Sequence, residues 1–159
     1  MTTTAPLTPL PPALLRVAQH LVEGTAPRDI ASKMHLTPET VRHYLRQLRE
    51  HLSCPPRSKP PVIVHALLTT RQLPPPTTGR PAPQLRPQEH RLLKAAAENS
   101  KADEIANASG IALAYVPSAL NALLTKTRTR DVTQLIVLAH AWGLLNTARG
   151  TSAVTGTAR

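Results

Sequence analysis

Basic and hydroxyl side chains are concentrated in the stretch "HLTPETVRHYLRQLREHL", residues 35–52. Apolar residues recur within it at helical spacing, at Val41, Leu45, Leu48 and Leu52. Thr37 stands where an N-cap is expected, and Pro38 suits the first helical position because its missing N–H is not needed there. The stretch therefore predicts a capped amphipathic helix with one buried seam.

The residues off this seam share the outward face of the expected helix: Thr40, Arg42, His43, Arg46 and Arg49. The planar fork of arginine can bond guanine O6 and N7 together or hold a phosphate. Thr37, Thr40 and the helix N-terminus can donate to phosphate oxygens. A short helix from about Pro27 and a tight turn precede this helix, which is the order of a helix-turn-helix. A merely solvated face is the alternative, but the turn and the caps favour contact with a DNA groove.

A second version of this element follows 75 residues later as "GIALAYVPSALNALLTKT", residues 110–127. The same offset matches Arg16 with Arg91, Ile30 with Ile105, Val41 with Val116, Leu45 with Leu120 and Leu48 with Leu123. Most matched positions are apolar and helically spaced, so the two halves are expected to share a core pattern. We interpret the chain as a tandem duplication.

Each half contains four apolar helical runs, so the fold class expected is all-α, with two four-helix units. A proline-rich stretch lies between them and is expected to be a semi-rigid spacer. We expect the two halves, residues 1–76 and 83–159, to fold independently. The organisation expected is a disordered N-terminus 1–9, a first unit 10–73, a linker 74–84, a second unit 85–145 and a disordered tail 146–159.

Two parts of the chain resemble a known family of DNA-binding domains. The segment "EGTAPRDIASKMHLTPETVRHYLRQLREHL" resembles the LuxR-type (GerE-like) DNA-binding domain, in which Glu-Gly is followed by a Lys/Arg-acid-Ile-Ala run and then by Ser/Thr-Pro-x-Thr-Val-Lys/Arg. In the second unit, "LRPQEHRLLKAAAEN" and "RTRDVTQLIVLAHAWGLL" are similar to the opening helix and the closing signature of that family. The resemblance covers most of both units and omits the tails and the linker.

The resemblance implies DNA-contacting positions in the first unit. The base-contacting positions fall on Arg42, His43 and Arg46, and the phosphate contacts on Lys33, Thr40 and Arg49. It also implies that the fourth helix, roughly residues 62–73, takes part in dimerisation, so a homodimer through the fourth helices is expected. The stretch "SCPPRSKPP" departs from the short connection usual before that helix.

The second unit has lost the cations of this face. Where the first unit has Thr40, Arg42, His43, Arg46 and Arg49, the second has Tyr115, Pro117, Ser118, Asn121 and Leu124. Because Pro117 would break a helix that began at the matching position, we expect that helix to begin about a turn later, near Tyr115. The neutral patch can mark a protein interface, and simple drift after loss of DNA contact is the alternative. The partner-interface residues expected are Leu113, Tyr115, Pro117, Leu124, Leu135, Leu138 and Trp142.

Composition narrows the function classes. The 159 residues contain 19 Lys and Arg against 9 Asp and Glu, a net charge of +10 that suits a polyanionic partner. Residues 7–73 hold nine Lys and Arg against four acids, whereas residues 85–145 hold seven against five. The single Cys54 and the histidines have no metal-ligand spacing, and no nucleophile motif or glycine-rich phosphate loop is present. We therefore expect no enzyme, no catalytic residue, no cofactor and no metal site.

The sequence thus predicts a DNA-binding transcriptional regulator whose first unit reads double-stranded DNA in the major groove. The second unit is expected to dimerise, dock a protein partner or position the first. Without a signal peptide or a long apolar run, the expected location is cytoplasmic and nucleoid-associated, with no membrane contact. Two alternatives remain: a protein-interaction module that pairs with another LuxR-type regulator or with RNA polymerase, and a nonspecific architectural protein.

Overall fold

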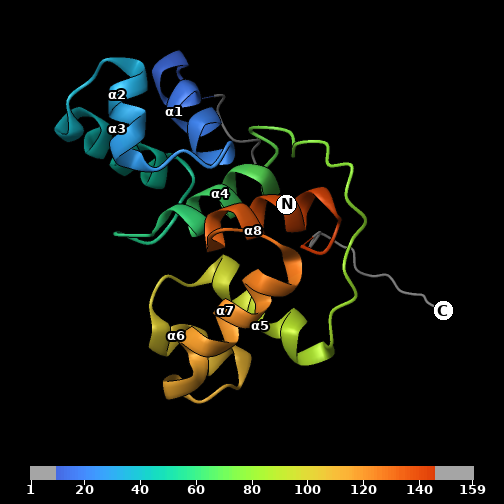
Figure 1. Ribbon diagram of the computed structural model, residues 1–159. Coiled ribbons are helices and arrows are strands. Elements are labelled where there is room, and N and C mark those ends of the chain that lie inside the picture. Colours follow the sequence, from blue (N-terminus) through green and yellow to red (C-terminus); the bar gives the residue numbers. More distant parts are fainter. Residues whose placement is uncertain (1–9, 146–159) are drawn as a thin grey trace, which may run out of the picture.

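The computed structural model describes residues 10–145, and every regular element in that range is helical (Figure 1). The first half contains α1 (Pro12–Val22), α2 (Pro27–Met34), α3 (Pro38–His51) and α4 (Pro60–Thr69). The second half contains α5 (Pro87–Glu98), α6 (Ala102–Ser109), the 3-10 turn η1 (Leu113–Tyr115), α7 (Val116–Thr127) and α8 (Val132–Ala141). The all-α fold class is therefore confirmed, while the tails expected to be disordered lie outside the described residues.

The helix that carries the basic face begins where its sequence predicts. Pro38 takes the first turn of α3, and the Thr37 hydroxyl accepts a hydrogen bond from the Thr40 N–H at 3.1 Å. His35 ends α2 in the left-handed conformation, with φ of 58°, and Gly110 ends α6 in the same conformation. A tight turn therefore separates α2 from α3, as in a helix-turn-helix.

The later start expected for the matching helix of the second half is confirmed. Residues 113–115 form η1 rather than a turn of α-helix, and α7 begins at Val116 with Pro117 in its first turn. A proline at this position removes no intrahelical hydrogen bond. The first turn of α7 thus lies about one turn later, relative to the repeat, than the first turn of α3.

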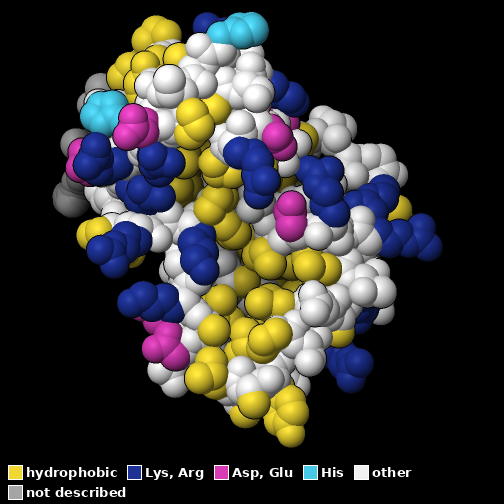
Figure 2. Space-filling model, turned by 60° about the vertical axis from the view of Figure 1, so that its left-hand side comes forward, with side chains coloured by type: hydrophobic (Ala, Val, Ile, Leu, Met, Phe, Trp, Pro, Cys, Tyr) yellow, Lys and Arg dark blue, Asp and Glu magenta, His cyan; other side chains and the backbone are white. Residues whose placement is uncertain are grey.

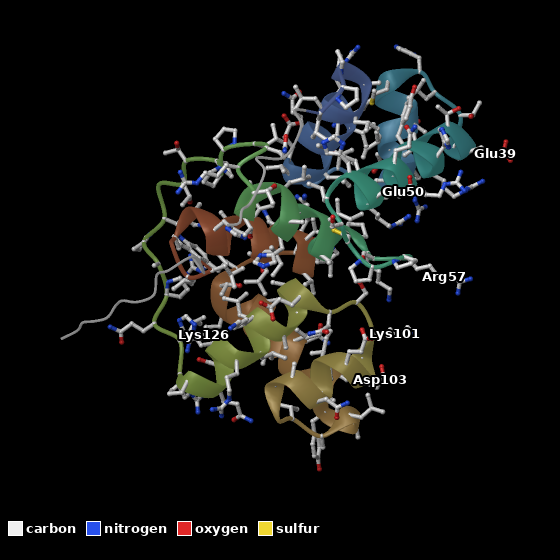
Figure 3. The ribbon with its side chains drawn as sticks, turned by 180° about the vertical axis from the view of Figure 1, so that it is seen from behind. Glu39, Glu50, Arg57, Lys101, Asp103 and Lys126 are labelled. Carbon is white, nitrogen blue, oxygen red and sulfur yellow. The ribbon has the colours of Figure 1, made fainter. Side chains whose placement is uncertain are left out.

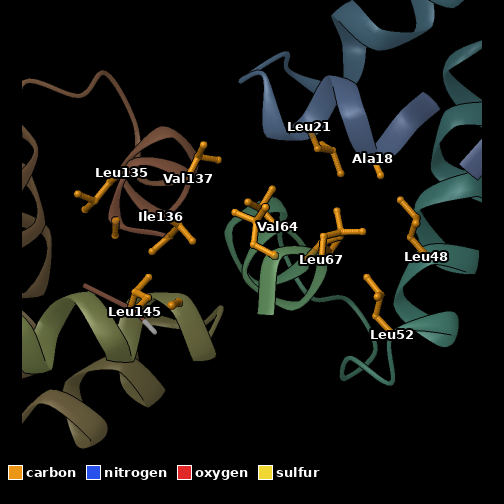
Figure 4. Close-up of a cluster of buried hydrophobic side chains, with 14 of the residues drawn as sticks. Ala18, Leu21, Leu48, Leu52, Val64, Leu67, Leu135, Ile136, Val137 and Leu145 are labelled. Atoms are coloured by element: carbon orange, nitrogen blue, oxygen red, sulfur yellow. The ribbon is translucent and has the colours of Figure 1, made fainter. Parts of the chain in front are cut away.

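The two halves share one buried core (Figure 4). In Figure 1, α4 and α8 lie side by side between the group α1–α3 and the group α5–α7, and they pack together more extensively than any other pair from different halves. Val64 and Leu67 of α4 and Ile136 of α8 are fully buried. Helix α4 packs against α1 on one side and α8 on the other, and Figure 4 shows Leu67 of α4 opposite Leu48 and Leu52.

Contacts at the two ends of this helix pair are reciprocal. The Lys59 N–H, before α4, donates to the Ser100 hydroxyl in the α5–α6 turn at 2.9 Å. The Arg130 guanidinium, before α8, donates to the Gly24 carbonyl in the α1–α2 turn at 3.1 Å. The start of the fourth helix in each half therefore contacts the turn between the first two helices of the other half. An approximate two-fold relation between the halves requires this pattern.

The structure differs from the sequence pattern at three places. Ser100 stands three residues before Asp103, the spacing of a capping box, but its hydroxyl makes no cap for α6, whose N-cap is Lys101, because it accepts the Lys59 N–H instead. Helix α4 spans residues 60–69 rather than 62–73, and Arg71 follows it with φ of 62°. The linker is held against the second half, since the Trp142 indole donates to the Arg80 carbonyl at 3.0 Å and the Arg80 guanidinium lies 5.8 Å from the ring centre. One hydrophobic core includes residues of both halves, which does not favour independent folding of residues 1–76 and 83–159.

Candidate nucleic-acid interface

Helix α3 presents its basic residues to solvent. Val41, Leu45 and Leu48 are buried against the rest of the first half, which fixes the opposite face outward. Three of the residues expected to contact DNA lie on that exposed face, namely Arg42, His43 and Arg46, and Lys33 and Thr37 are exposed beside them. Thr40 is half-buried. The structure thus brings these residues together around the N-terminal half of one helix, the part that reaches base edges in a helix-turn-helix.

Hydrogen bonds order this face. The Arg46 guanidinium lies 3.1 Å from His43 Nδ1, one turn earlier on the helix. In this contact the arginine donates, so a neutral Nδ1 of His43 accepts. The hydroxyls of Thr37 and Thr40 lie 2.8 Å apart. Arg42 makes no ion pair with a carboxylate of the described residues, so its guanidinium is open to a nucleic-acid partner.

Arg49 has a structural role that its sequence position did not indicate. Its Nε donates to the Ser58 carbonyl at 2.8 Å, and the Ser58 hydroxyl donates to the Pro55 carbonyl at 2.6 Å. The side chain is half-buried under the connection from α3 to α4. Arg49 therefore anchors the proline-rich connection, and only its remaining guanidinium donors are available for the phosphate contact expected of it.

Positive charge is unevenly distributed over the surface. Figure 2 shows Lys and Arg side chains across the upper part of the face in view, while a hydrophobic band runs down to a lower end with few cations. The acids of α3 stand at its ends, Glu39 in the first turn and Glu50 in the last (Figure 3). A phosphate backbone would therefore meet cations along the middle of α3.

The matching face of the second half is exposed and neutral. The exposed residues of α7 include Pro117, Ser118 and Asn121. The relative exposures of Leu113 and Tyr115 are 52% and 67%. Lys126 at the end of α7 is bound by Glu89 of α5 at 2.8 Å, and this hydrogen bond lowers the pKa of the Glu89 carboxyl. The face thus offers no free cation in the N-terminal half of α7.

The structure separates the residues expected at the partner interface into two groups. Leu113, Tyr115 and Pro117 remain exposed, and Leu124 is half-buried. Leu135 is buried within the chain, while Leu138 and Trp142 are half-buried on and just after α8. The α8 residues are thus engaged largely within the chain, and only the η1–α7 group offers an open surface.

Two histidines that sequence reasoning did not single out join the halves. His65 Nδ1 of α4 and His140 Nε2 of α8 lie 2.9 Å apart, and the residues are separated by the same 75 positions as the duplicated helices. Burial lowers the pKa of His65, with the nearby charge of Lys94 adding to the effect. Burial also lowers the pKa of His140 to about 4, with His65 contributing. The repeat offset was the signal that could have paired them.

Among residues 10–145, few other side chains are candidates for metal binding or reactivity. No group of three or more His, Cys, Asp or Glu side chains there could hold a metal ion. Cys54 is free and half-buried, and burial raises the pKa of its thiol. Within the same range, no single helix is both long and apolar enough to cross a membrane.

Comparisons with protein-family models, with curated proteins and with solved structures gave no match.

Proposed function

We propose that this protein is a sequence-specific DNA-binding transcriptional regulator that reads the major groove through α3. The observation that carries the proposal is the exposed face of Arg42, His43 and Arg46 on a helix capped at Thr37 and held by a tight turn after α2. Guanidinium groups in the N-terminal half of such a helix suit guanine edges, and Lys33 suits a phosphate. In this proposal both halves are LuxR-type helix-turn-helix units, and the protein acts at the nucleoid in the cytoplasm.

The pairing of α4 with α8 changes how a dimer would form. The fully buried Val64 and Ile136 already cover these helices within one chain. The homodimer through the fourth helices stays a prediction, and it would have to form by exchange of α8 between chains or through the parts of α4 and α8 that remain partly exposed. Without such a dimer, one chain is the DNA-binding unit and supplies one basic reading helix.

The second candidate function is a protein-interaction module that pairs with another regulator or with RNA polymerase. The observation that favours it is the exposed Leu113 and Tyr115 beside a hollow of about 410 Å³, whose lining includes Ile111 and Leu123. This surface is neutral and partly apolar, as protein interfaces often are. It differs from the α3 face in that its lining holds one arginine, Arg86, together with one carboxylate, Glu89.

Selection from a pool of random DNA duplexes distinguishes the two functions. We expect the full chain to enrich one motif that contains guanine, because Arg42 and Arg46 suit guanine edges. Arg91→Ala, which removes an exposed cation from α5, is the matched control and should enrich the same motif. If the full chain enriched no motif, the DNA-reading proposal would fail, and the protein-interaction module would be the better account.

A further inference from the structure

The second half contains a reading helix whose face is uncharged, and the way the two halves pair determines where that helix lies. Building on the proposed function, we infer that a single chain occupies two consecutive major grooves of an asymmetric DNA site. In this arrangement α3 reads the first groove and α7 lies at the second, where it favours A·T base pairs. The failure of this inference would leave readout by α3 intact.

The first step is the approximate two-fold relation between the halves. Helix α4 contacts α5, and α8 contacts α1, so the fourth helix of each half touches the first helix of the other. The Lys59–Ser100 and Arg130–Gly24 hydrogen bonds repeat this reciprocity at the turns. The hydrogen bond between His65 and His140 connects the fourth helices themselves. Such a relation gives α3 and α7 equivalent places on either side of the axis.

The second step concerns DNA geometry. Two helix-turn-helix units related by a two-fold axis place their second helices in half-sites about 10 base pairs apart. When two identical chains form the pair, both half-sites are read alike. Here the pair forms within one chain from two different helices, so the two half-sites are read differently.

The third step is the chemistry of α7. Its exposed positions Pro117, Ser118 and Asn121 match Arg42, His43 and Arg46 of α3 in the repeat. An asparagine amide can bond adenine N6 and N7 together, and apolar side chains such as that of Pro117 contact the thymine methyl group. None of these side chains supplies the donor fork that suits guanine. The second groove is therefore expected to favour A·T pairs.

The charges around α7 limit how much the second half-site adds to affinity. Lys126 is neutralised by Glu89, and Asp103 and Glu104 lie exposed in the first turn of α6. No cation lies on the N-terminal half of α7, so fewer counterions would be released from phosphates at this helix than at α3. The second half-site thus adds sequence preference, while α3 and its neighbours supply most of the binding free energy.

Duplexes with one fixed and one varied half-site test the inference. The first half-site is the motif that the full chain selects, and the second, about 10 base pairs away, is either a mixed A·T or a G·C sequence. We expect one chain per duplex and binding about fivefold tighter or more to the A·T form. Asn121→Ala should reduce this difference, because only the thymine contact of Pro117 remains, and it should keep the preference for the first half-site. Asn107→Ala, an exposed asparagine of α6, should keep both.

Different contrary outcomes rule out the role of α7, the single-chain arrangement or the proposed function. Equal binding to the two forms, a G·C preference, or an unchanged A·T preference in Asn121→Ala would overturn the role given to α7. Two chains per duplex at saturation would overturn the single-chain arrangement. Loss of any preference for the first half-site in the wild-type chain would instead overturn the proposed function. Circular dichroism of Asn121→Ala must match that of the wild-type chain, and its exposed position makes a folding defect unexpected.

Discussion

His65 Nδ1 and His140 Nε2 lie 2.9 Å apart and join α4 to α8 by a hydrogen bond. One ring must donate and the other accept, so at least one of the two rings is neutral in this contact. The bond lies between the two halves. Both of its partners are groups that can gain a proton as the pH falls, whereas most other hydrogen bonds of the structure join groups that cannot. Acid is therefore expected to weaken the contact between the halves.

Stability should fall as the pH decreases from about 6.5 towards 4. Burial lowers the pKa of His65, and that of His140 to about 4, so over this window the unfolded chain binds more protons than the folded chain. Their contribution to the free energy of unfolding is thus complete above pH 6.5 and is lost progressively below it. Urea titrations between pH 7.5 and 4 measure this loss. His140→Gln should flatten the dependence relative to the exposed-site control His90→Gln, and equal slopes would contradict the assignment.

Removing a side chain from the α4–α8 contact should destabilise both halves. Ile136 is fully buried, so Ile136→Ala is expected to lower the free energy of unfolding by about 2–5 kcal/mol. Because the core is shared, amide hydrogen exchange in α3 should accelerate although Ile136 belongs to the other half. Leu113→Ala, at a position 52% exposed, should change stability by less than about 0.5 kcal/mol. Unaltered exchange in α3 would show that the halves are independent.

Removing the N-cap of α3 should lower the free energy of unfolding, although every cation of the helix stays in place. Thr37→Ala deletes the hydroxyl that accepts the Thr40 N–H at 3.1 Å, and we expect a loss of about 1 kcal/mol in the free energy of unfolding. Chemical denaturation provides the measurement. Thr125→Ala, at an exposed position inside α7, should cause no such loss. Equal effects of the two variants would mean that the cap does not stabilise α3.

Lys33 is expected to bind phosphate rather than a base. It is exposed in the last turn of α2, so Lys33→Ala should weaken binding to all duplexes by a similar factor. The slope of log K against log salt should become shallower by about 1, because one fewer phosphate is neutralised. Titrations at several salt concentrations, with Arg91→Ala as the charge-matched control, give both quantities. A change in sequence preference would assign Lys33 to base readout instead.

Local signals predicted much of this fold. The Thr37 cap, the turn before α3 and the late start of α7 at Val116 follow from residues within a few positions of each feature. The exposure of Arg42 and Arg46 also followed, because Val41, Leu45 and Leu48 form a buried seam on the opposite side of α3. Caps, prolines and helical periodicity act locally, so a single sequence contains them.

Contacts between the halves were not predicted, because they depend on side chains far apart in the sequence. Ser100 has the spacing of a local cap but accepts the Lys59 N–H, 41 residues away. Arg49 has the position of a phosphate contact, yet its Nε is bound to the Ser58 carbonyl. The apolar faces of α4 and α8 indicated a pairing surface but could not indicate whether the pair forms within one chain or between two.

Readout of DNA through α3 is tested by the ratio of specific to nonspecific dissociation constants for the double variant Arg42→Ala/Arg46→Ala. This ratio is measured by competition at one salt concentration, with the selected motif and a scrambled duplex. Because each good base contact contributes about 1–3 kcal/mol of discrimination, the ratio should fall by about tenfold or more. Arg91→Ala should preserve the wild-type ratio. A double variant that kept the wild-type ratio while both affinities declined equally would contradict readout through α3.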